Sequence, residues 1–386
     1  MKITVIICEY NPFHNGHLYH IKKTRENGAT HIVAVMSGNY VQRGDTAIMD
    51  KFERAKLAVK GGADLVIEIP TVYSMSSAEF YARGSVYILD SLGCVDEISF
   101  GSEVGLVTEL EKAAEIAKEC SNSPELEEYL RSGMSYPNAI NTMLYSQYGK
   151  RLSNRISEIL ASPNNVLAIE YLKALQHFNS SIKPFTVQRK SAAHDSMTVL
   201  DGISSASFIR KCMTEKSDFS GLVPTYVSQA YINACSAGKI ADISNLERII
   251  IYKLRTSAPE ELRQIPDVGQ GLEYRILSAA DHNNLEEIFM TIKTKRYTMA
   301  RLKRIVLNML IGVKKSDLEI LPPYGRILAV TERGRDILSK AKNTGKIPFA
   351  TSLSKLAQTS DDAERFAKLE GTASAIYALA QKKIGK

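Results

Sequence analysis

The chain has 386 residues, of which 44% are hydrophobic and 24% charged, and its formal net charge is +7. This length predicts two domains, and the composition is that of a soluble protein with enough apolar residues for a core. No apolar run reaches the roughly 18 residues that a membrane span needs, and the N-terminus MKITVIICEY lacks the features of a signal peptide. We therefore expect a cytoplasmic protein without membrane contact, whose positive charge favours polyanionic partners such as nucleotides or RNA.

The cysteines are scattered along the chain and form no CxxC pair. This pattern indicates reduced thiols and argues against a zinc knuckle or a disulfide framework. The five cysteines are Cys8, Cys94, Cys120, Cys212 and Cys235.

Four short apolar runs in the first hundred residues alternate with three helical patterns, each of which ends in glycine. Short apolar runs are typical of buried parallel strands, and glycine is common where a helix ends in a left-handed turn. The order predicts an α/β fold, a parallel sheet covered by helices, with ligands at the carboxyl ends of the strands. The expected strands are 3–10, 31–37, 64–70 and 95–102, and the expected helices are 17–28, 50–62 and 77–93.

Residues 104–180 change to a helical pattern, and a further strand candidate follows at 182–190. We interpret the helical range as an insertion, after which the chain returns to the sheet. Beyond Pro224 the apolar spacing is near 3.6 almost throughout, which predicts helices. The sequence therefore predicts an α/β domain over 1–220 and a mostly α-helical domain over 221–386.

The segment NPFHNGH, with His14, Gly16 and His17, follows the first expected strand. There, a turn directs backbone N–H groups and the positive end of a helix dipole into the ligand cleft. Gly16 permits close approach of a phosphate, and imidazoles can donate hydrogen bonds as charge builds on a leaving pyrophosphate. A metal site needs a third ligand, and no HExxH arrangement occurs. We favour a phosphate site over a polar turn with incidental histidines.

NPFHNGH resembles the HxGH signature of the nucleotidylyltransferase superfamily, whose members form adenylates on a Rossmann-like sheet. Its second element is a serine-rich helix start, S-S-T-x-I-R, where this chain has SASFIR over 205–210. Alanine replaces the middle serine and serine the threonine, while Ser207 and Arg210 keep a hydroxyl and a guanidinium. A helix N-terminus with these groups suits a second contact with triphosphate oxygens. The alternative is an ordinary helix cap with a surface arginine.

Longer strings make the resemblance more specific. SGNYVQRG, SFGSE, SPNN and QRK, together with NPFHNGH, look like the tRNA(Met) cytidine acetate ligase family, chiefly over 1–210. No KMSKS string of an aminoacyl-tRNA synthetase occurs. The resemblance implies that acetate and ATP form acetyl-adenylate and pyrophosphate. The exocyclic amine of the wobble cytidine of elongator tRNA(Met) would then take the acetyl group, giving N4-acetylcytidine.

The same resemblance implies which residues contact ATP, with 1–220 as the catalytic domain. Gly101 would let adenosine pack against bare backbone, Asn164 would hydrogen-bond the ribose or base, and Arg189 would reach the phosphates. The ordinary alternatives are a turn glycine, a helix cap and a surface charge. The expected ATP contacts are Ile7, Cys8, Glu9, Tyr10, Asn11, Pro12, Phe13, His14, Asn15, Gly16, His17, Leu18, Tyr19, His20, Gly101, Asn164, Arg189, Ser207 and Arg210.

Gln42, Arg43 and Asp45 lie in a glycine-bounded loop after the second expected strand, which should open onto the same cleft. We expect Arg43 to be catalytic, with His14 and His17, by helping to bind acetate; binding of phosphate or pairing with Asp45 are its alternatives. Mg²⁺ is expected on the triphosphate, without a dedicated protein metal site.

The segment KTKRYTMARLKR, 293–304, holds six basic residues and no acidic one. On a helix these residues would cover much of one surface, with Met299, Leu302 and Ile305 turned to the core. Such a surface suits contact with the RNA backbone, although a solvated basic face without a partner is the alternative. The expected tRNA contacts are Lys293, Lys295, Arg296, Arg301, Lys303 and Arg304.

Two other functions compete with the acetate ligase. A small-molecule adenylyltransferase of the same superfamily would release pyrophosphate while joining AMP to a phosphorylated precursor, but it needs only the α/β core. A non-catalytic RNA-binding module would retain the fold without the chemistry. The intact His14, Gly16, His17 and Arg210 weigh against that module.

Overall fold

The structure is a computed structural model that describes residues 1–386 except 122, 135, 190–202, 270, 295–296 and 384–386. Its centre is a sheet of seven strands, and a separate two-stranded hairpin lies outside this sheet. The sheet strands are β1 (Ile3–Cys8), β2 (His31–Ser37), β5 (Leu65–Ile69), β6 (Glu97–Ser102), β7 (Lys183–Gln188), β8 (Gly325–Val330) and β9 (Phe349–Ala350), and the hairpin strands are β3 (Tyr40–Val41) and β4 (Asp45–Thr46).

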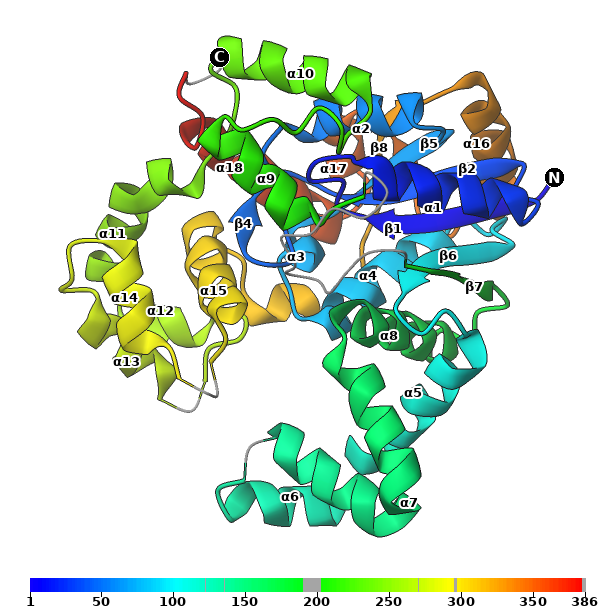
Figure 1. The fold of residues 1–386 in the computed structure, drawn as a ribbon. Coiled ribbons are helices and arrows are strands. Elements are labelled where there is room, and N and C mark those ends of the chain that lie inside the picture. Colours follow the sequence, from blue (N-terminus) through cyan, green and yellow to red (C-terminus); the bar gives the residue numbers. More distant parts are fainter. Residues whose placement is uncertain (122, 135, 190–202, 270, 295–296, 384–386) are drawn as a thin grey trace.

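Helices cover both faces of the sheet and extend from it in two groups (Figure 1). None of the described helices combines the length and apolar character needed to cross a bilayer. The helices are α1 (Asn15–Glu26), α2 (Lys51–Lys60), α3 (Thr71–Ser74), α4 (Ala78–Asp90), α5 (Val107–Ser121), α6 (Pro124–Arg131), α7 (Tyr136–Ala161), α8 (Pro163–His177), α9 (Ala206–Glu215), α10 (Thr225–Ser236), α11 (Glu247–Thr256), α12 (Pro259–Arg263), α13 (Leu272–Ala279), α14 (Leu285–Ile292), α15 (Met299–Ile311), α16 (Glu332–Thr344), α17 (Leu353–Ala357) and α18 (Asp361–Leu379), with short 3-10 turns at Ile243–Leu246 and Lys315–Leu318.

The strand order is β7–β6–β1–β2–β5–β8–β9, and the first five strands are parallel to one another. Alternate residues of β1 enter separate apolar clusters, Ile3 and Val5 on one face and Ile6 and Cys8 on the other. Side chains of α4, α8 and α18 fill the first cluster, and those of α1, α2, α9 and α10 fill the second. Because both faces are covered, the central strands are mostly apolar, as in other parallel sheets.

The predicted α/β fold is confirmed, with strands in all five predicted places and helices α5 to α8 in the predicted insertion. The sequence did not predict β8 and β9, which come from the range 221–386. β8 pairs antiparallel with β5, so the sheet draws strands from both sides of residue 220. Figure 1 shows α11, α13 and α14 grouped away from the sheet, and α6 and α7 projecting on another side.

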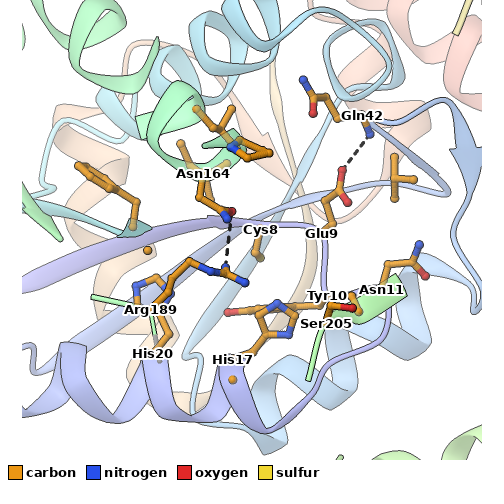
Figure 2. Close-up of a pocket in the computed structure, with 18 of the residues that line it drawn as sticks. Cys8, Glu9, Tyr10, Asn11, His17, His20, Gln42, Asn164, Arg189 and Ser205 are labelled. Carbon is orange, nitrogen blue, oxygen red and sulfur yellow. Dashed lines mark hydrogen bonds between the residues drawn. The ribbon is translucent and has the colours of Figure 1, made fainter. Parts of the chain in front are cut away.

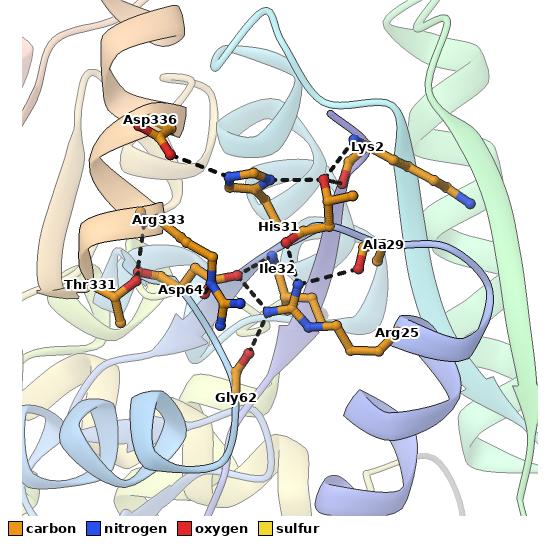
Figure 3. Close-up of polar contacts among 12 residues, drawn as sticks. Lys2, Arg25, Ala29, His31, Ile32, Gly62, Asp64, Thr331, Arg333 and Asp336 are labelled. Atoms are coloured by element: carbon orange, nitrogen blue, oxygen red, sulfur yellow. Dashed lines mark hydrogen bonds and ion pairs between the residues drawn. The ribbon is translucent and has the colours of Figure 1, made fainter.

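A buried carboxylate, Asp64, joins three elements at the amino-terminal edge of β5 (Figure 3). Its Oδ2 accepts hydrogen bonds from Arg25 Nη2 at 2.6 Å and from the backbone N–H of Ile32 at 2.9 Å. Its Oδ1 accepts from Arg333 Nε at 2.9 Å. A carboxylate that is 1% exposed is stable as an anion only with such partners. Asp64 therefore fixes α1 and α16 on β2 and β5.

Candidate active site

A cavity of about 730 Å³ lies at the carboxyl ends of β1 and β6 (Figure 2). The strand order reverses at β1, because β2 and β5 extend the sheet on one side and β6 and β7 on the other. Open α/β sheets bind ligands at such a switch point, and this volume is typical of a small-molecule site. The cavity wall also includes residues of the β3–β4 hairpin, α8, α9 and α15.

His14 and His17 stand at the N-terminus of α1 with their rings stacked, the centroids 3.7 Å apart. The backbone N–H of Gly16 donates to His14 Nδ1 at 3.1 Å, and the backbone N–H of His14 donates to His17 Nδ1 at 3.2 Å. Each neutral ring therefore carries its proton on Nε2. A Cβ on residue 16 would lie 2.9 Å from His14 Cε1, so the stacked arrangement requires glycine there.

Burial and nearby cations keep these imidazoles neutral. Burial, with help from Arg189 and Arg210, lowers the pKa of His14 to about 3. Burial, His14 and Arg189 lower the pKa of His17 well below its usual value. Burial lowers the pKa of His20, whose Nε2 lies 2.9 Å from a serine hydroxyl of β6, to about 4. At neutral pH the pair at the helix N-terminus is thus a set of uncharged N–H donors.

Not every residue of the segment 7–20 lines the cavity, whereas the resemblance implied ATP contacts throughout the segment. Phe13 is fully buried beside the C-terminal end of α2, and Pro12 is buried in the turn. Leu18 is 40% exposed, and the Asn15 amide donates to a backbone carbonyl between α9 and α10 at 2.9 Å. The residues of this segment that line the cavity are Ile7, Cys8, Glu9, Tyr10, Asn11, His14, Gly16, His17, Tyr19 and His20.

The start of α9 forms a second wall of the cavity. Ser205 caps this helix by accepting a hydrogen bond from the backbone N–H of Phe208 at 3.1 Å. Arg210 donates to the backbone carbonyl of Asn11 at 2.8 Å and to Ser207 Oγ at 3.4 Å. Arg210 and Ser207 both line the cavity. The structure therefore brings SASFIR to NPFHNGH, as the sequence predicted.

Gly101, Asn164 and Arg189 meet at the opposite wall. Arg189 Nη1 lies 3.5 Å from Asn164 Oδ1, and Asn164 Nδ2 donates to Glu103 Oε1 at 2.6 Å. The fully buried Asn165, which sequence reasoning missed, accepts hydrogen bonds from the backbone N–H groups of residues 103 and 104. The sequence feature that could have revealed Asn165 is that it is the second asparagine of SPNN. Asn165 fixes the loop after β6 against α8 and so sets the distance between Gly101 and Asn164.

The β3–β4 hairpin lies beside the cavity and carries Gln42, Arg43 and Asp45, all of which line it. The backbone N–H of Gln42 donates to Glu9 Oε1 at 2.8 Å (Figure 2). Asp45 Oδ2 lies 3.7 Å from Lys303 Nζ on α15, which also lines the cavity. The predicted opening of this loop onto the cleft is confirmed, and α15 adds a cation that sequence reasoning had placed only on an RNA-binding face.

The basic segment does not form one exposed face. Arg304 is buried and donates to Asp267 Oδ2 at 2.9 Å and to the backbone carbonyl of Gln42 at 3.3 Å, so it is engaged within the protein and does not lie on an exposed face. Arg301 donates to the backbone carbonyl of Asp267 at 2.6 Å, while Lys293 is exposed. Met299 is half-buried, and Leu302 and Ile305 are in the core as predicted. The expected contacts Lys295 and Arg296 lie outside the described residues.

This sheet, with a histidine-capped helix at its switch point, defines a nucleotidyltransferase of the HIGH class, and the family model described as HIGH Nucleotidyl Transferase matches residues 1–386. The tRNA(Met) cytidine acetate ligase of Thermoanaerobacter sp. (strain X514) is 40% identical over 393 residues, covering 99% of this chain and 96% of the relative. The enzyme of that name from Alkaliphilus metalliredigens (strain QYMF) is 37% identical over 406 residues, covering 99% and 95%. The chain belongs to the tRNA(Met) cytidine acetate ligase family.

Solved structures agree with this assignment. The crystal structure of apo Thermotoga maritima TmcAL superposes with a TM-score of 0.92 at 30% identity, covering 100% of this chain and 96% of that chain. The structure of Thermotoga maritima TmcAL bound with alpha-thio ATP has a TM-score of 0.89 at the same 30% identity and the same coverage.

Proposed function

We propose that this chain is an ATP-dependent acetate ligase, which activates acetate as acetyl-adenylate and transfers the acetyl group to N4 of the wobble cytidine of elongator tRNA(Met). One observation carries the proposal: a single cavity joins the stacked His14–His17 pair to the Ser207–Arg210 pair. The relatives are named for the ligase reaction, and one structural relative binds an ATP analogue. The product would be N4-acetylcytidine.

In the first step, an acetate oxygen attacks the α-phosphorus of ATP. The bond between that phosphorus and its bridging oxygen breaks, and pyrophosphate leaves with the electron pair. We assign the Nε2–H groups of His14 and His17 to phosphate oxygens, with Arg210 and Ser207 as further donors. Because backbone hydrogen bonds already hold both rings, these donors need no reorganisation as charge develops on the leaving group.

We assign the adenosine to the wall formed by Gly101, Asn164 and Arg189. Gly101 presents backbone to the cavity, and the Asn164 amide is oriented by its hydrogen bond to Glu103. Arg189 is exposed at the end of β7, and its charge contributes to the low pKa of His14. A guanidinium at this place would bind the phosphates on their adenosine side.

Mg²⁺ would enter with the triphosphate and neutralise part of its charge. In the described part of the chain, no three His, Cys, Asp or Glu side chains converge to hold a metal. Mg²⁺ is commonly held by substrate phosphates, water and one or two carboxylates. Asp45 is a carboxylate at the cavity, so the residues present fit an ion carried mainly by ATP.

We assign Arg43 to the acetate carboxylate before activation. Its side chain lines the cavity from the β3–β4 hairpin, and a guanidinium matches a carboxylate in a two-point contact.

For tRNA we propose an approach along the side that range 221–386 forms, with 1–220 as the catalytic part. Lys293 and Arg301 would contact the RNA backbone there, and Lys303 would meet it at the cavity.

Incubation with radiolabelled acetate, ATP and total tRNA, followed by nucleoside analysis, tests the proposal. We expect label in N4-acetylcytidine of tRNA(Met) and ATP–pyrophosphate exchange that requires acetate. Exchange that requires a phosphorylated precursor instead of acetate would indicate a small-molecule adenylyltransferase. Binding of RNA without any exchange would indicate a non-catalytic module.

A further inference from the structure

Glu9 places a negative charge in the cavity that we propose binds two anions, ATP and acetate. It follows the last residue of β1, is half-buried, and lines the cavity. Among the described residues that line this cavity, only Glu9 and Asp45 carry carboxylates. ATP and acetate are both negatively charged, so a carboxylate here weakens their binding unless it contacts a donor or a cation.

The two carboxylates differ in their surroundings. Asp45 has Lys303 Nζ at 3.7 Å and accepts the backbone N–H of Thr46 at 2.9 Å. Glu9 accepts one neutral donor, the backbone N–H of Gln42 at 2.8 Å, through Oε1. Its Oε2 has no recorded donor among the residues that the structure describes. Figure 2 shows this carboxylate directed toward Gln42 and away from His17.

The Glu9 carboxylate is linked through Gln42 to the part of the chain that follows residue 221. Gln42 donates to Glu9 through its N–H and accepts from Arg304 through its carbonyl, at 3.3 Å. Asp267 in turn holds Arg304 at 2.9 Å. Gly44 packs so tightly on α15 that a Cβ would lie 2.5 Å from the backbone nitrogen of Arg304. The hairpin therefore transmits the position of α15 to the Glu9 carboxylate.

We propose that Glu9 forms the amine subsite of the cavity, binding the exocyclic amino group of the target cytosine and accepting its proton during acetyl transfer. This assignment rests on the proposed function, because among the groups that react in it only the cytidine amine carries N–H donors. A carboxylate is the natural acceptor for the N4 amino group of cytosine. Arg304 is a positioning residue for this subsite through Gln42.

The transfer step balances with Glu9 as the base. The N4 lone pair forms a bond to the acetyl carbonyl carbon, and the bond from that carbon to the phosphate oxygen of acetyl-adenylate breaks. AMP leaves with the electron pair, and one N4 proton passes to Glu9 Oε2 and then to solvent. General-base catalysis of this kind contributes about 10²–10⁴-fold.

The test separates the two steps with Glu9→Gln in the full-length protein. Acetate-dependent ATP–pyrophosphate exchange reports the first step, and single-turnover transfer from synthetic acetyl-adenylate to tRNA reports the second. We expect unchanged exchange and a transfer rate that falls about 100-fold or more. Glu9→Asp should restore part of the transfer rate. The exposed Glu26, on α1, supplies the matched control Glu26→Gln, which should change neither rate.

Two results would overturn the assignment. An equal loss of exchange and transfer would make Glu9 a ligand of Mg²⁺ or of ATP, and an unchanged transfer rate would leave it without a role as base. Failure of the wild-type protein to acetylate tRNA from acetyl-adenylate would instead refute the proposed function, and the subsite with it. If the melting temperature of Glu9→Gln is lowered, the same comparison in Glu9→Asp decides.

Discussion

The His14 and His17 rings stack 3.7 Å apart, and each Nδ1 accepts a backbone N–H, so both Nε2–H groups are available as donors. We predict that His14→Ala or His17→Ala lowers kcat of acetate-dependent ATP–pyrophosphate exchange by about 10²–10³-fold, since removing one oriented donor at a developing anion has this cost. Steady-state exchange assays would measure the loss.

Two substitutions at His17 test whether the Nε2–H group acts as a hydrogen-bond donor or the side chain only fills space. The glutamine amide nitrogen lies near the place of Nε2, whereas the asparagine amide nitrogen lies near that of Nδ1. His17→Gln should therefore retain more exchange activity than His17→Asn. Equal activity of the two variants would contradict the tautomer assigned here.

Arg304 and Lys293 should differ sharply in their effect on RNA binding. Lys293 is exposed, so Lys293→Ala should lower the slope of log K against log salt by about 1 if the residue contacts a phosphate. Arg304 is engaged by Asp267 and Gln42, so Arg304→Gln should leave that slope unchanged and slow acetyl transfer. Filter binding across a salt series measures the slope, and a lower slope for Arg304→Gln would show that this residue contacts RNA directly.

Asp64 should be a stability residue without a catalytic role. Asp64→Asn leaves Arg25 and Arg333 without their anion, and because both arginines are partly exposed the loss should be about 1–3 kcal/mol. Denaturant unfolding would measure this loss as a lower midpoint with an unchanged slope. The folded variant should bind ATP as the wild type does, and weakened binding in the folded variant would contradict this separation.

Stability should fall in acid partly because His14 resists protonation. Its pKa is lowered from 6.5 to about 3 in the folded protein, so between these values the unfolded chain binds a proton that the folded chain does not. Each such proton lowers the free energy of unfolding by about 1.4 kcal/mol per pH unit as pH falls. His14→Gln should flatten the decline below pH 6.5, whereas His177→Gln at the exposed end of α8 serves as the control. Identical acid slopes for His14→Gln and the wild type would contradict the assignment.

Local patterns predicted the parallel core and much of the site. The apolar runs of β1, β2, β5, β6 and β7 were visible because buried strands need continuous apolar residues. The position of HNGH after β1 then placed His14 and His17 at the ligand end of the sheet. SASFIR was located by its likeness to a known element, and the structure brings it to the same cavity.

What the sequence did not reveal depends on contacts between distant segments. Arg304 lies in a basic segment of the kind that binds RNA, but it is buried because it pairs with Asp267. Asp267 lies 37 residues earlier in the chain, outside any helix or strand. The contact between Glu9 and Gln42 spans 33 residues and depends on the hairpin geometry. β8 is only partly buried, and its short apolar run resembles the runs in the neighbouring helices. The sequence pattern therefore did not distinguish this strand from a helix.

Acetate labelled with ¹⁸O in both oxygens tests the central claim most directly. If acetate attacks the α-phosphorus and the amine later cleaves the carbon–oxygen bond, one labelled oxygen must remain on AMP. We predict, for incubation with ATP and tRNA(Met), one ¹⁸O atom in the phosphate group of AMP for each N4-acetylcytidine formed, as measured by mass spectrometry. Label in inorganic phosphate, or unlabelled AMP beside acetylated tRNA, would contradict an acetyl-adenylate intermediate.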